Sequence, residues 1–236
     1  MDEGSRRASD ADRIRAAYAR RRTSIDPERH SMRRPGNRIA DEERERILLA
    51  ALARRGSARL SDLDILEVGC GSGGVLARLV SLGADPHRLH GIDLLEHSAA
   101  AARSAVPEAT IVVADASQLP YADATFDLTY QATPLSSMTS PLMRAAVAAE
   151  MQRVTRSGSL IISYDFAWNP TNRDTVGITS RELRWLFPGL PLEIHRTTLV
   201  PPLGRWMGDR SVRLTRMPAA IPILKSHRLA FIDVVR

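Results

Sequence analysis

The sequence has a single cysteine, Cys70, and no long apolar run. One cysteine cannot form an intramolecular disulfide, so a disulfide scaffold is excluded and the cytoplasm, a reducing compartment, is the expected location. No stretch approaches the roughly 18 uninterrupted apolar residues of a membrane helix, and the charged residues 1–12 lack the apolar core of a signal peptide. We therefore expect neither membrane spanning nor export.

Aromatic residues and lysine are also scarce: aromatics make up 5% of the chain, and one lysine stands against 32 arginines. Residues 1–59 hold 16 Arg and 10 acidic residues, residues 60–172 hold 6 Arg and 12 acidic residues, and residues 173–236 hold 11 basic and 5 acidic residues. The net charges of these parts are +6, −6 and +6. A negative central part without interleaved basic and aromatic residues makes nucleic acid an unexpected partner.

The overall composition, 44% hydrophobic and 25% charged over 236 residues, is that of a globular protein with one large core. Helices are expected over residues 12–22, with Ile14, Ala17 and Tyr18 on one face, and over 41–55. In the second helix the acidic residues crowd the start, arginines the end, and Gly56 follows. Its buried stripe is predicted to be Ile47, Leu48, Ala51 and Leu52. Residues 1–58 thus form a helical segment, either a packing cap or a lid over a substrate site.

From residue 60 short apolar runs alternate with helical ones. Strands are predicted over 63–68, 89–92, 110–114, 126–130 and 159–166, and helices over 74–82, 97–105 and 141–154. This alternation favours parallel strands with helices on both faces. A short helix over 179–186 and two strands over 192–200 and 228–235 follow. We expect residues 59–236 to form an α/β, Rossmann-like, doubly wound sheet of seven strands, mostly parallel with an antiparallel C-terminal strand.

A glycine-rich turn, Gly69-Cys70-Gly71-Ser72-Gly73-Gly74, joins the first strand to its helix. Glycines allow a tight turn and close approach of a ligand to the backbone, and the helix start offers free amide groups. The spacing of Gly69, Gly71 and Gly74 matches the dinucleotide fingerprint, which is weak evidence alone.

Three acidic residues accompany the turn: Glu67 before it, Asp93 at the end of the second strand and Asp115 after the third. Asp93 can accept the hydroxyls of a ribose, and Asp115 the amino group of an adenine. Glu67 can offset a positive charge near the turn. S-adenosylmethionine is positive where a dinucleotide carries a negative pyrophosphate, so these acids favour the methyl donor as cofactor. An NAD-dependent oxidoreductase stays open as an alternative.

Residues 65–74, 91–95, 115–119 and 126–128 resemble the class I S-adenosylmethionine-dependent methyltransferases, over roughly residues 60–166. The resemblance implies that Gly69, Gly71 and Gly73 line the methionine end of the donor, that Asp93 holds its ribose, and that Asp115 with the Ala116 amide reads its adenine. The full cofactor set that we expect is Glu67, Gly69, Cys70, Gly71, Gly73, Asp93, Leu94, Asp115, Ala116 and Gln131. Cys70 itself is interpreted as a small packing residue rather than a covalent catalyst.

Further segments resemble a bacterial subgroup associated with surface-glycan or secondary-metabolite pathways. They are residues 131–133, 164–166, 169–170, 176–178, 198–203 and 226–230. This resemblance implies a small hydroxylated acceptor, a saccharide among the candidates. Whether the enzyme is a homodimer is left open.

The loop after the fourth strand bears on the acceptor. Its residues, Gln131-Ala132-Thr133-Pro134-Leu135, lack the Asn/Asp-Pro-Pro-aromatic signature of amino-group methylation. Carbon methylation through a cysteine adduct needs a cysteine in another loop, and Cys70 is the only one. We therefore predict O-methylation of a hydroxyl group, with an RNA methyltransferase using the arginine-rich flanks as a further alternative.

An aliphatic hydroxyl needs a base to take its proton. We predict Asp165, beside Tyr164 at the end of the fifth strand, as that base, with a turn residue as the alternative interpretation. Asn169, Arg173 and His195 are candidates for orienting the acceptor or are structural. Metal use is not expected, because Phe166 rather than an asparagine follows Asp165.

Overall fold

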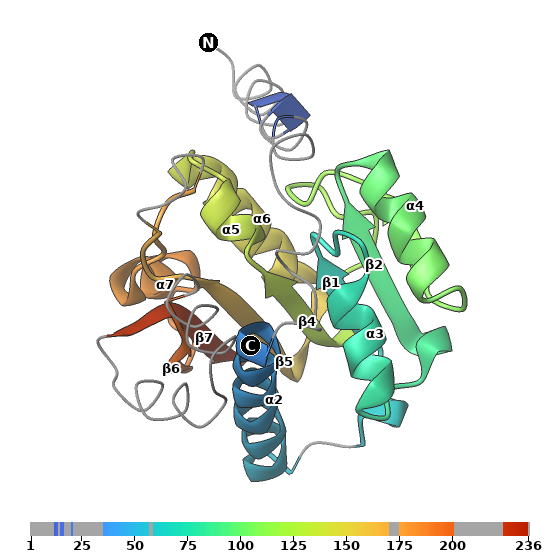
Figure 1. Cartoon of the computed structure of the whole chain (residues 1–236), viewed down its shortest axis with the longest axis horizontal. Helices are drawn as coiled ribbons and strands as arrows, with labels where there is room; N and C mark the ends of the chain where they lie inside the picture. Colours follow the sequence, from blue (N-terminus) through green and yellow to red (C-terminus); the bar gives the residue numbers. More distant parts are fainter. Residues whose placement is uncertain are drawn as a thin grey trace.

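The computed structural model describes residues 12, 13, 15, 16, 20, 35–56, 59–169, 175–200 and 224–235. One seven-stranded sheet crosses the molecule in the order β3-β2-β1-β4-β5-β7-β6 (Figure 1). The strands are β1 (Ile65–Val68), β2 (Leu89–Asp93), β3 (Thr110–Val113), β4 (Phe126–Ala132), β5 (Thr155–Phe166), β6 (Leu192–Leu199) and β7 (Lys225–Asp233). Strands β1 to β5 pair in parallel, and β7 runs antiparallel to both β5 and β6. The predicted fold class is confirmed.

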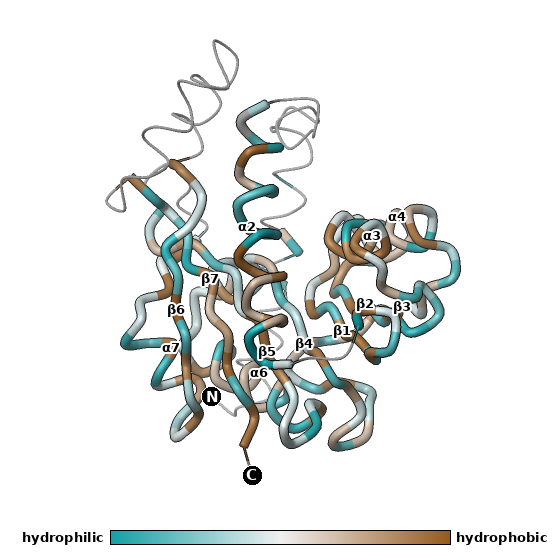
Figure 2. The backbone as a smooth tube through the Cα atoms, turned by 90° about the horizontal axis from the view of Figure 1, so that it is seen from below, coloured by the Kyte–Doolittle hydropathy of each residue, from teal (hydrophilic) through white to brown (hydrophobic). Residues whose placement is uncertain are grey.

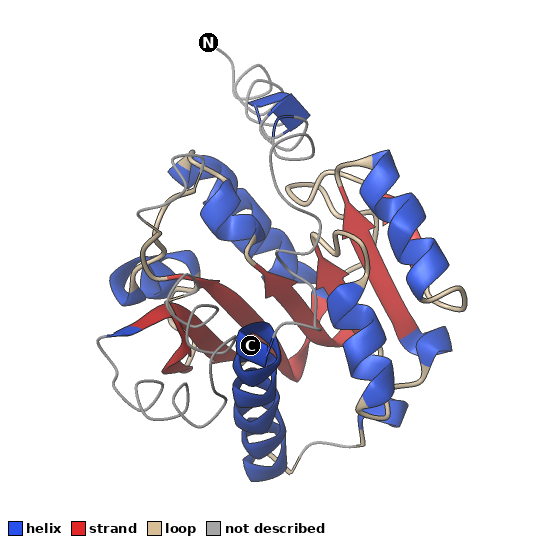
Figure 3. Cartoon of the chain, in the orientation of Figure 1, coloured by secondary structure: helices blue, strands red, loops and turns tan. Residues whose placement is uncertain are grey.

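Helices cover both faces of this sheet (Figure 3). They are α2 (Pro35–Arg54), α3 (Gly74–Ser81), α4 (Glu96–Ala105), α5 (Pro134–Ser137), α6 (Pro141–Val154) and α7 (Ser180–Leu186), with short 3₁₀ turns at Leu60–Asp62 and Pro86–Arg88. Buried side chains of α2, α3 and α4 form one hydrophobic cluster with the sheet, and those of α5, α6 and α7 form the other. None of the described helices has the length and apolar run that crossing a bilayer requires.

Helix α2 packs against the sheet through Leu48, Ala51 and Leu52, which are buried as predicted. Brown and teal segments alternate along it in Figure 2. It begins at Pro35, six residues before the predicted start. Proline is favourable at the first helical position, because its fixed φ suits the helix and its missing N–H is not needed there. The predicted face of Ile14, Ala17 and Tyr18 lies outside the described residues.

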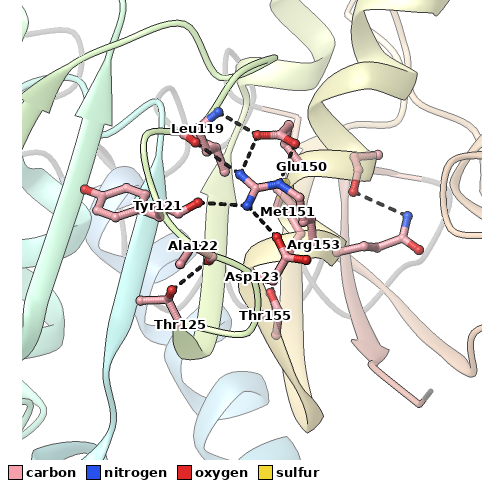
Figure 4. A network of polar contacts seen from close by, with 11 residues as sticks. Leu119, Tyr121, Ala122, Asp123, Thr125, Glu150, Met151, Arg153 and Thr155 are labelled. Atoms are coloured by element: carbon pink, nitrogen blue, oxygen red, sulfur yellow. Dashed lines mark hydrogen bonds and ion pairs between the residues drawn. The ribbon is translucent and has the colours of Figure 1, made fainter.

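The connection from β3 to β4, residues 114–125, contains no helix and is held by side chains of α6 (Figure 4). The Arg153 guanidinium donates to the carbonyls of Tyr121 at 2.8 Å and Leu119 at 3.1 Å. Glu150 accepts from Arg153 at 2.7 Å and from the Leu119 amide at 2.6 Å. Arg153 and Glu150 thereby fix this loop against α6, together with backbone hydrogen bonds from Ala124 and Thr125 to the end of α6.

Two adjacent glycines test the close packing of the turn. Gly73 has φ +80° and a Cβ there would lie 3.0 Å from Ala102 Cα, whereas a Cβ on the exposed Gly74 meets nothing within 4 Å. We expect Gly73→Ala to lower the free energy of unfolding by about 1–3 kcal/mol. Alanine is disfavoured at this positive φ, and its methyl group would press against Ala102. Gly74→Ala is the matched control and should be neutral or stabilising by up to about 1 kcal/mol. Urea unfolding of both variants is the measurement, and equal midpoints would contradict the packing argument.

Candidate active site

A hollow enclosing about 620 Å³, part of it open to solvent, lies at the carboxyl ends of the strands. It sits where the strand order reverses around β1 and β4, the usual ligand position in open α/β sheets. Its lining comes from the ends of four strands, from α5 and from the start of α6. The lining residues are Gly69, Ile92, Asp93, Leu94, Leu95, Ala114, Asp115, Ala116, Ala132, Pro134, Ser137, Met138 and Met143.

The glycine turn forms one edge of this hollow and is braced from two sides. Gly69 has φ +72°, and a Cβ there would lie 3.0 Å from Cβ of Pro134, so only glycine fits beside α5. The amide of Gly71 donates to Asp93 Oδ2 at 2.9 Å. The amide of Cys70 donates to the Ile92 carbonyl at 2.8 Å. The turn therefore has a fixed position relative to the end of β2.

Asp93 and Asp115 enter the hollow from the ends of β2 and β3. Besides Gly71, the Asp93 carboxylate accepts the amide of Leu95 at 2.9 Å through Oδ1. Burial raises the pKa of Asp93, against these backbone hydrogen bonds, which lower it. Asp115 accepts the amide of Ser117 at 2.8 Å. Carboxylate oxygens accept more than one hydrogen bond each, so both groups can serve the chain and a hydroxylated ligand together.

Glu67 lies behind the turn, 2% exposed, and its Oε2 has no hydrogen-bond partner among the described residues. Burial raises the pKa of Glu67 well above its usual range, while the positive charge of Arg44 opposes this shift. A buried carboxylate oxygen without a partner is costly unless something outside the chain completes it. A cationic group of a ligand is the complement that such an oxygen fits.

Arg44, which sequence reasoning missed, reaches this region from α2. Its guanidinium carbon lies 4.9 Å from the ring centroid of Tyr164, and its Nη2 lies 2.7 Å from Asp41. Burial alone would lower the pKa of Arg44, but the neighbouring Tyr130 and Tyr164 and the carboxylates of Asp41 and Glu67 raise it. Arg44 therefore stays charged, and its charge acts on Glu67. The arginine-rich composition around it gave no signal that this one side chain is buried.

Tyr164 does not line the hollow. It lies on the α2 face of the sheet, where its hydroxyl forms a 2.7 Å hydrogen bond with Thr198 and its ring stacks on His227 at 4.8 Å. The side chain is 7% exposed, and burial raises its pKa. These contacts account for its hydroxyl and its ring without a ligand.

Asp165 faces the opposite side of the sheet and is enclosed by the chain. It is 1% exposed, and its Oδ1 accepts the amide of Ser136 at 2.9 Å. Its Oδ2 accepts from Ser163 Oγ at 3.2 Å and from Gln131 Nε2. Burial raises the pKa of Asp165 to about 6, although the hydrogen bonds from Gln131 and Ser136 lower it. The geometry favours the alternative interpretation of Asp165 as a turn residue, because neither oxygen reaches the hollow.

The predicted acceptor contacts do not gather at the hollow. His195 on β6 pairs with Glu193 at 2.8 Å and packs edge-on against Phe231. Asn169 lies half-buried after β5, outside the lining. Arg173 lies outside the described residues. The structure does not support a contact of His195 with the methyl acceptor, because Glu193 and Phe231, its neighbours, lie where the end of α2 packs on the sheet.

Half of the predicted cofactor set meets in the lining, namely Gly69, Asp93, Leu94, Asp115 and Ala116. Glu67, Gly71 and Gly73 lie in or behind the turn, and Gln131 bonds to Asp165 instead of lining the hollow. Cys70 is buried, and burial raises the pKa of its thiol, which suits a packing residue. The α5 wall, with Pro134, Ser137 and Met138, was missed; a proline at the first position of a helix was its only signal.

Residues 65–158 match a family model described as a methyltransferase domain. These residues thus form a methyltransferase domain. Solved structures share its fold. A methyltransferase from Mesorhizobium loti is 17% identical, with a TM-score of 0.55, 78% of this chain and 95% of that chain covered. One from Methanosarcina mazei is 18% identical, with a TM-score of 0.53 and coverages of 74% and 93%.

A third neighbour is the geranyl diphosphate C-methyltransferase of Streptomyces coelicolor, solved with S-adenosyl-L-homocysteine. It is 14% identical, with a TM-score of 0.52, 72% of this chain and 70% of that chain covered. No curated protein sequence matches the chain. The cofactor of the methyltransferase domain is S-adenosylmethionine, and the unpartnered Glu67 Oε2 beside the glycine turn fits its positively charged end.

Asp93→Ala should weaken binding of S-adenosylhomocysteine, the demethylated donor, at least tenfold. The substitution removes the acceptor expected for the ribose hydroxyls and releases the amides of Gly71 and Leu95. Isothermal titration calorimetry of the full chain measures the change. Glu108→Ala, at an exposed position outside the hollow, is the control and should bind like the unchanged chain. Equal affinities for all three proteins would remove Asp93 from the donor site.

Asp165→Asn should change how stability depends on pH. Burial raises the folded-state pKa of Asp165 from 3.8 to about 6, so the folded chain binds more protons than the unfolded chain between these values. Its stability contribution is therefore complete below about pH 4 and is lost as the pH rises through 6. The variant lacks this loss, so its stability relative to the unchanged chain should rise by about 3 kcal/mol between pH 4 and pH 7. Urea unfolding across this range is the measurement, with the non-titrating Thr129→Val as control; parallel curves would contradict the expectation.

Proposed function

We propose that the protein transfers the methyl group of S-adenosylmethionine to a hydroxyl of a small sugar-like or natural-product acceptor. The observation that carries this proposal is the wall of the hollow opposite the two acidic residues. It consists of Ala132, Pro134, Ser137 and Met138, apolar groups with one hydroxyl. Such a wall suits a neutral, partly apolar acceptor and offers no carboxylate or amide to hold an amino group.

Two other acceptor chemistries lose support for physical reasons. Carbon methylation through a thiol adduct needs an accessible thiolate, whereas Cys70 is buried and its pKa is raised. Amino-group methylation uses polar groups after β4, whereas the Gln131 amide donates to Ser163 at 2.5 Å and to Asp165. The match to a methyltransferase domain sets the oxidoreductase alternative aside.

The residues of the hollow would hold the donor from three sides. Asp93 would accept the ribose hydroxyls, Asp115 with the Ala116 amide would read the adenine, and Glu67 would balance the ammonium group. When bound, the donor supplies an electrophilic methyl group on a sulfonium. The chain's task is then to align the acceptor with it and to exclude water, which the apolar residues of the lining serve.

The same lining indicates how acidic the acceptor hydroxyl has to be. Asp93 and Asp115 are its only titratable residues among those that the structure describes, and both belong to the donor end. With Asp165 enclosed, no described carboxylate stands ready to take a proton from an aliphatic alcohol. We therefore propose that acceptors with acidic hydroxyls, such as phenols and enols, react faster than sugar alcohols.

Residues 1–58 enter this proposal as a cap over the methionine end. Its described part, α2, buries Leu48, Ala51 and Leu52 on the sheet and brings Arg44 beside Tyr164. We also propose that the enzyme belongs to a bacterial subgroup acting in surface-glycan or secondary-metabolite pathways, that it is cytoplasmic and that it forms a homodimer.

A screen with donor radiolabelled in its methyl group tests the proposed function. The full chain is incubated with phenols, sugars, lipids, polyketides and RNA, and the labelled position is found by mass spectrometry. We expect the labelled methyl group on a hydroxyl oxygen. Phenols should react at least about 10²-fold faster than sugar alcohols, because a general base typically contributes a rate factor of about this size and phenols need it less. Label on carbon or nitrogen would overturn O-methylation. Label on RNA, with binding that weakens steeply as salt rises, would favour the RNA alternative.

A further inference from the structure

We propose that Asp165 is a positioning residue whose carboxylate fixes the α5 wall of the donor hollow. This inference rests on the methyltransferase domain and goes beyond the choice of acceptor. Asp165, at the end of β5, accepts from the amide of Ser136 in α5, from Ser163 on β5 and from Gln131 on β4. One buried carboxylate therefore joins two neighbouring strands to the short helix that follows the first of them.

The α5 segment needs such a brace because it has little stability of its own. It comprises only four residues, fewer than an isolated helical turn requires. Thr133, which precedes it, has φ +71°, a left-handed conformation that costs a non-glycine residue on the order of 1 kcal/mol or more. The Thr133 amide donates to the Tyr164 carbonyl at 2.7 Å, and Ser136 donates to Asp165 at 2.9 Å. Tyr164 thus holds Thr133, the residue before α5, and Asp165 holds Ser136 within α5.

The α5 segment in turn shapes the hollow and touches the glycine turn. Pro134, Ser137 and Met138 belong to the lining. Gly69 lies so close to Pro134 that even one added carbon would stand 3.0 Å from it. A shift of α5 by a fraction of an ångström would move this wall and press on the turn. Asp165 therefore acts on the donor through Pro134 and its neighbours, without touching it.

The surroundings of Asp165 also predict which substitution preserves its role. The Gln131 Oε1 atom has no hydrogen-bond partner among the described residues, although the side chain is fully buried. In Asp165→Asn, the amide oxygen can still accept from Ser136, and its NH₂ group can donate to Gln131 Oε1 once the Gln131 amide has flipped so that its Oε1 and Nε2 exchange positions. In Asp165→Leu, the Ser136 amide loses its acceptor in a buried site, and the Gln131 NH₂ group keeps only its hydrogen bond to Ser163.

Calorimetric binding of S-adenosylhomocysteine to the full chain distinguishes these variants. We expect Asp165→Leu to bind at least tenfold more weakly and Asp165→Asn to stay within about threefold of the unchanged chain. Gln131→Met, which removes one donor and keeps the carboxylate, should fall between them and serves if Asp165→Leu does not fold. Thr129→Val is the matched control. It breaks the buried 2.7 Å pair between Thr129, which lies on β4 like Gln131, and Thr155 on β5, outside the lining of the hollow, and should lower stability without changing affinity.

The outcomes separate this inference from the proposals above. If the unchanged chain does not bind S-adenosylhomocysteine, the donor assignment itself fails. If it binds and both Asp165→Leu and Gln131→Met bind equally tightly, the positioning role is overturned. If Asp165→Asn keeps its affinity but loses more than 10²-fold in the rate of methyl transfer, Asp165 is a base after all, and the inference is likewise overturned. Rescue by Asp165→Asn in both affinity and rate supports it.

Discussion

Hydrogen bonds from loop amides to buried carboxylates at the carboxyl edge of the sheet are the interaction on which the hollow depends. Parallel strands all end at this edge, and the loops that leave them carry backbone amides that no ladder satisfies. Asp93 takes two of these amides, from Gly71 and Leu95. Asp115 takes the amide of Ser117, and Asp165 that of Ser136. Each carboxylate fixes a loop before any ligand is considered.

Because carboxylates at this edge bind loop amides as well as ligands, the sequence predicts where such acidic residues lie but not what they bind. The glycine turn and its strand and helix are local patterns, and the register of parallel strands places residues that end them side by side. Gly69, Asp93 and Asp115 therefore line the same hollow. Asp165 follows the same pattern, but strand alternation points it to the α5 side, where a four-residue helix without detectable periodicity encloses it. No local signal distinguishes a carboxylate that faces a ligand from one that braces a loop.

The side chains contributed by distant segments lie beyond local patterns altogether. Arg44 belongs to a segment whose many arginines look like solvated surface, and only the packing of α2 on the sheet brings it beside Tyr164. His195 shows the converse. It was a candidate for orienting the acceptor, whereas α2 covers that part of the sheet and Glu193 and Phe231 contact the ring. Tertiary contacts between segments far apart in the chain decided both cases.

The buried carboxylates differ in whether both of their oxygens have hydrogen-bond partners within the chain, and this difference indicates their roles. Burial raises the pKa of Glu67, Asp93 and Asp165 alike, so burial alone does not separate them. Both oxygens of Asp165 are occupied by the chain, and the group is complete without a ligand. Glu67 leaves Oε2 without a partner among the described residues at 2% exposure, which is unfavourable in a buried site. Glu67, beside the glycine turn, thus keeps one oxygen open to a ligand, whereas Asp165 is complete and braces α5.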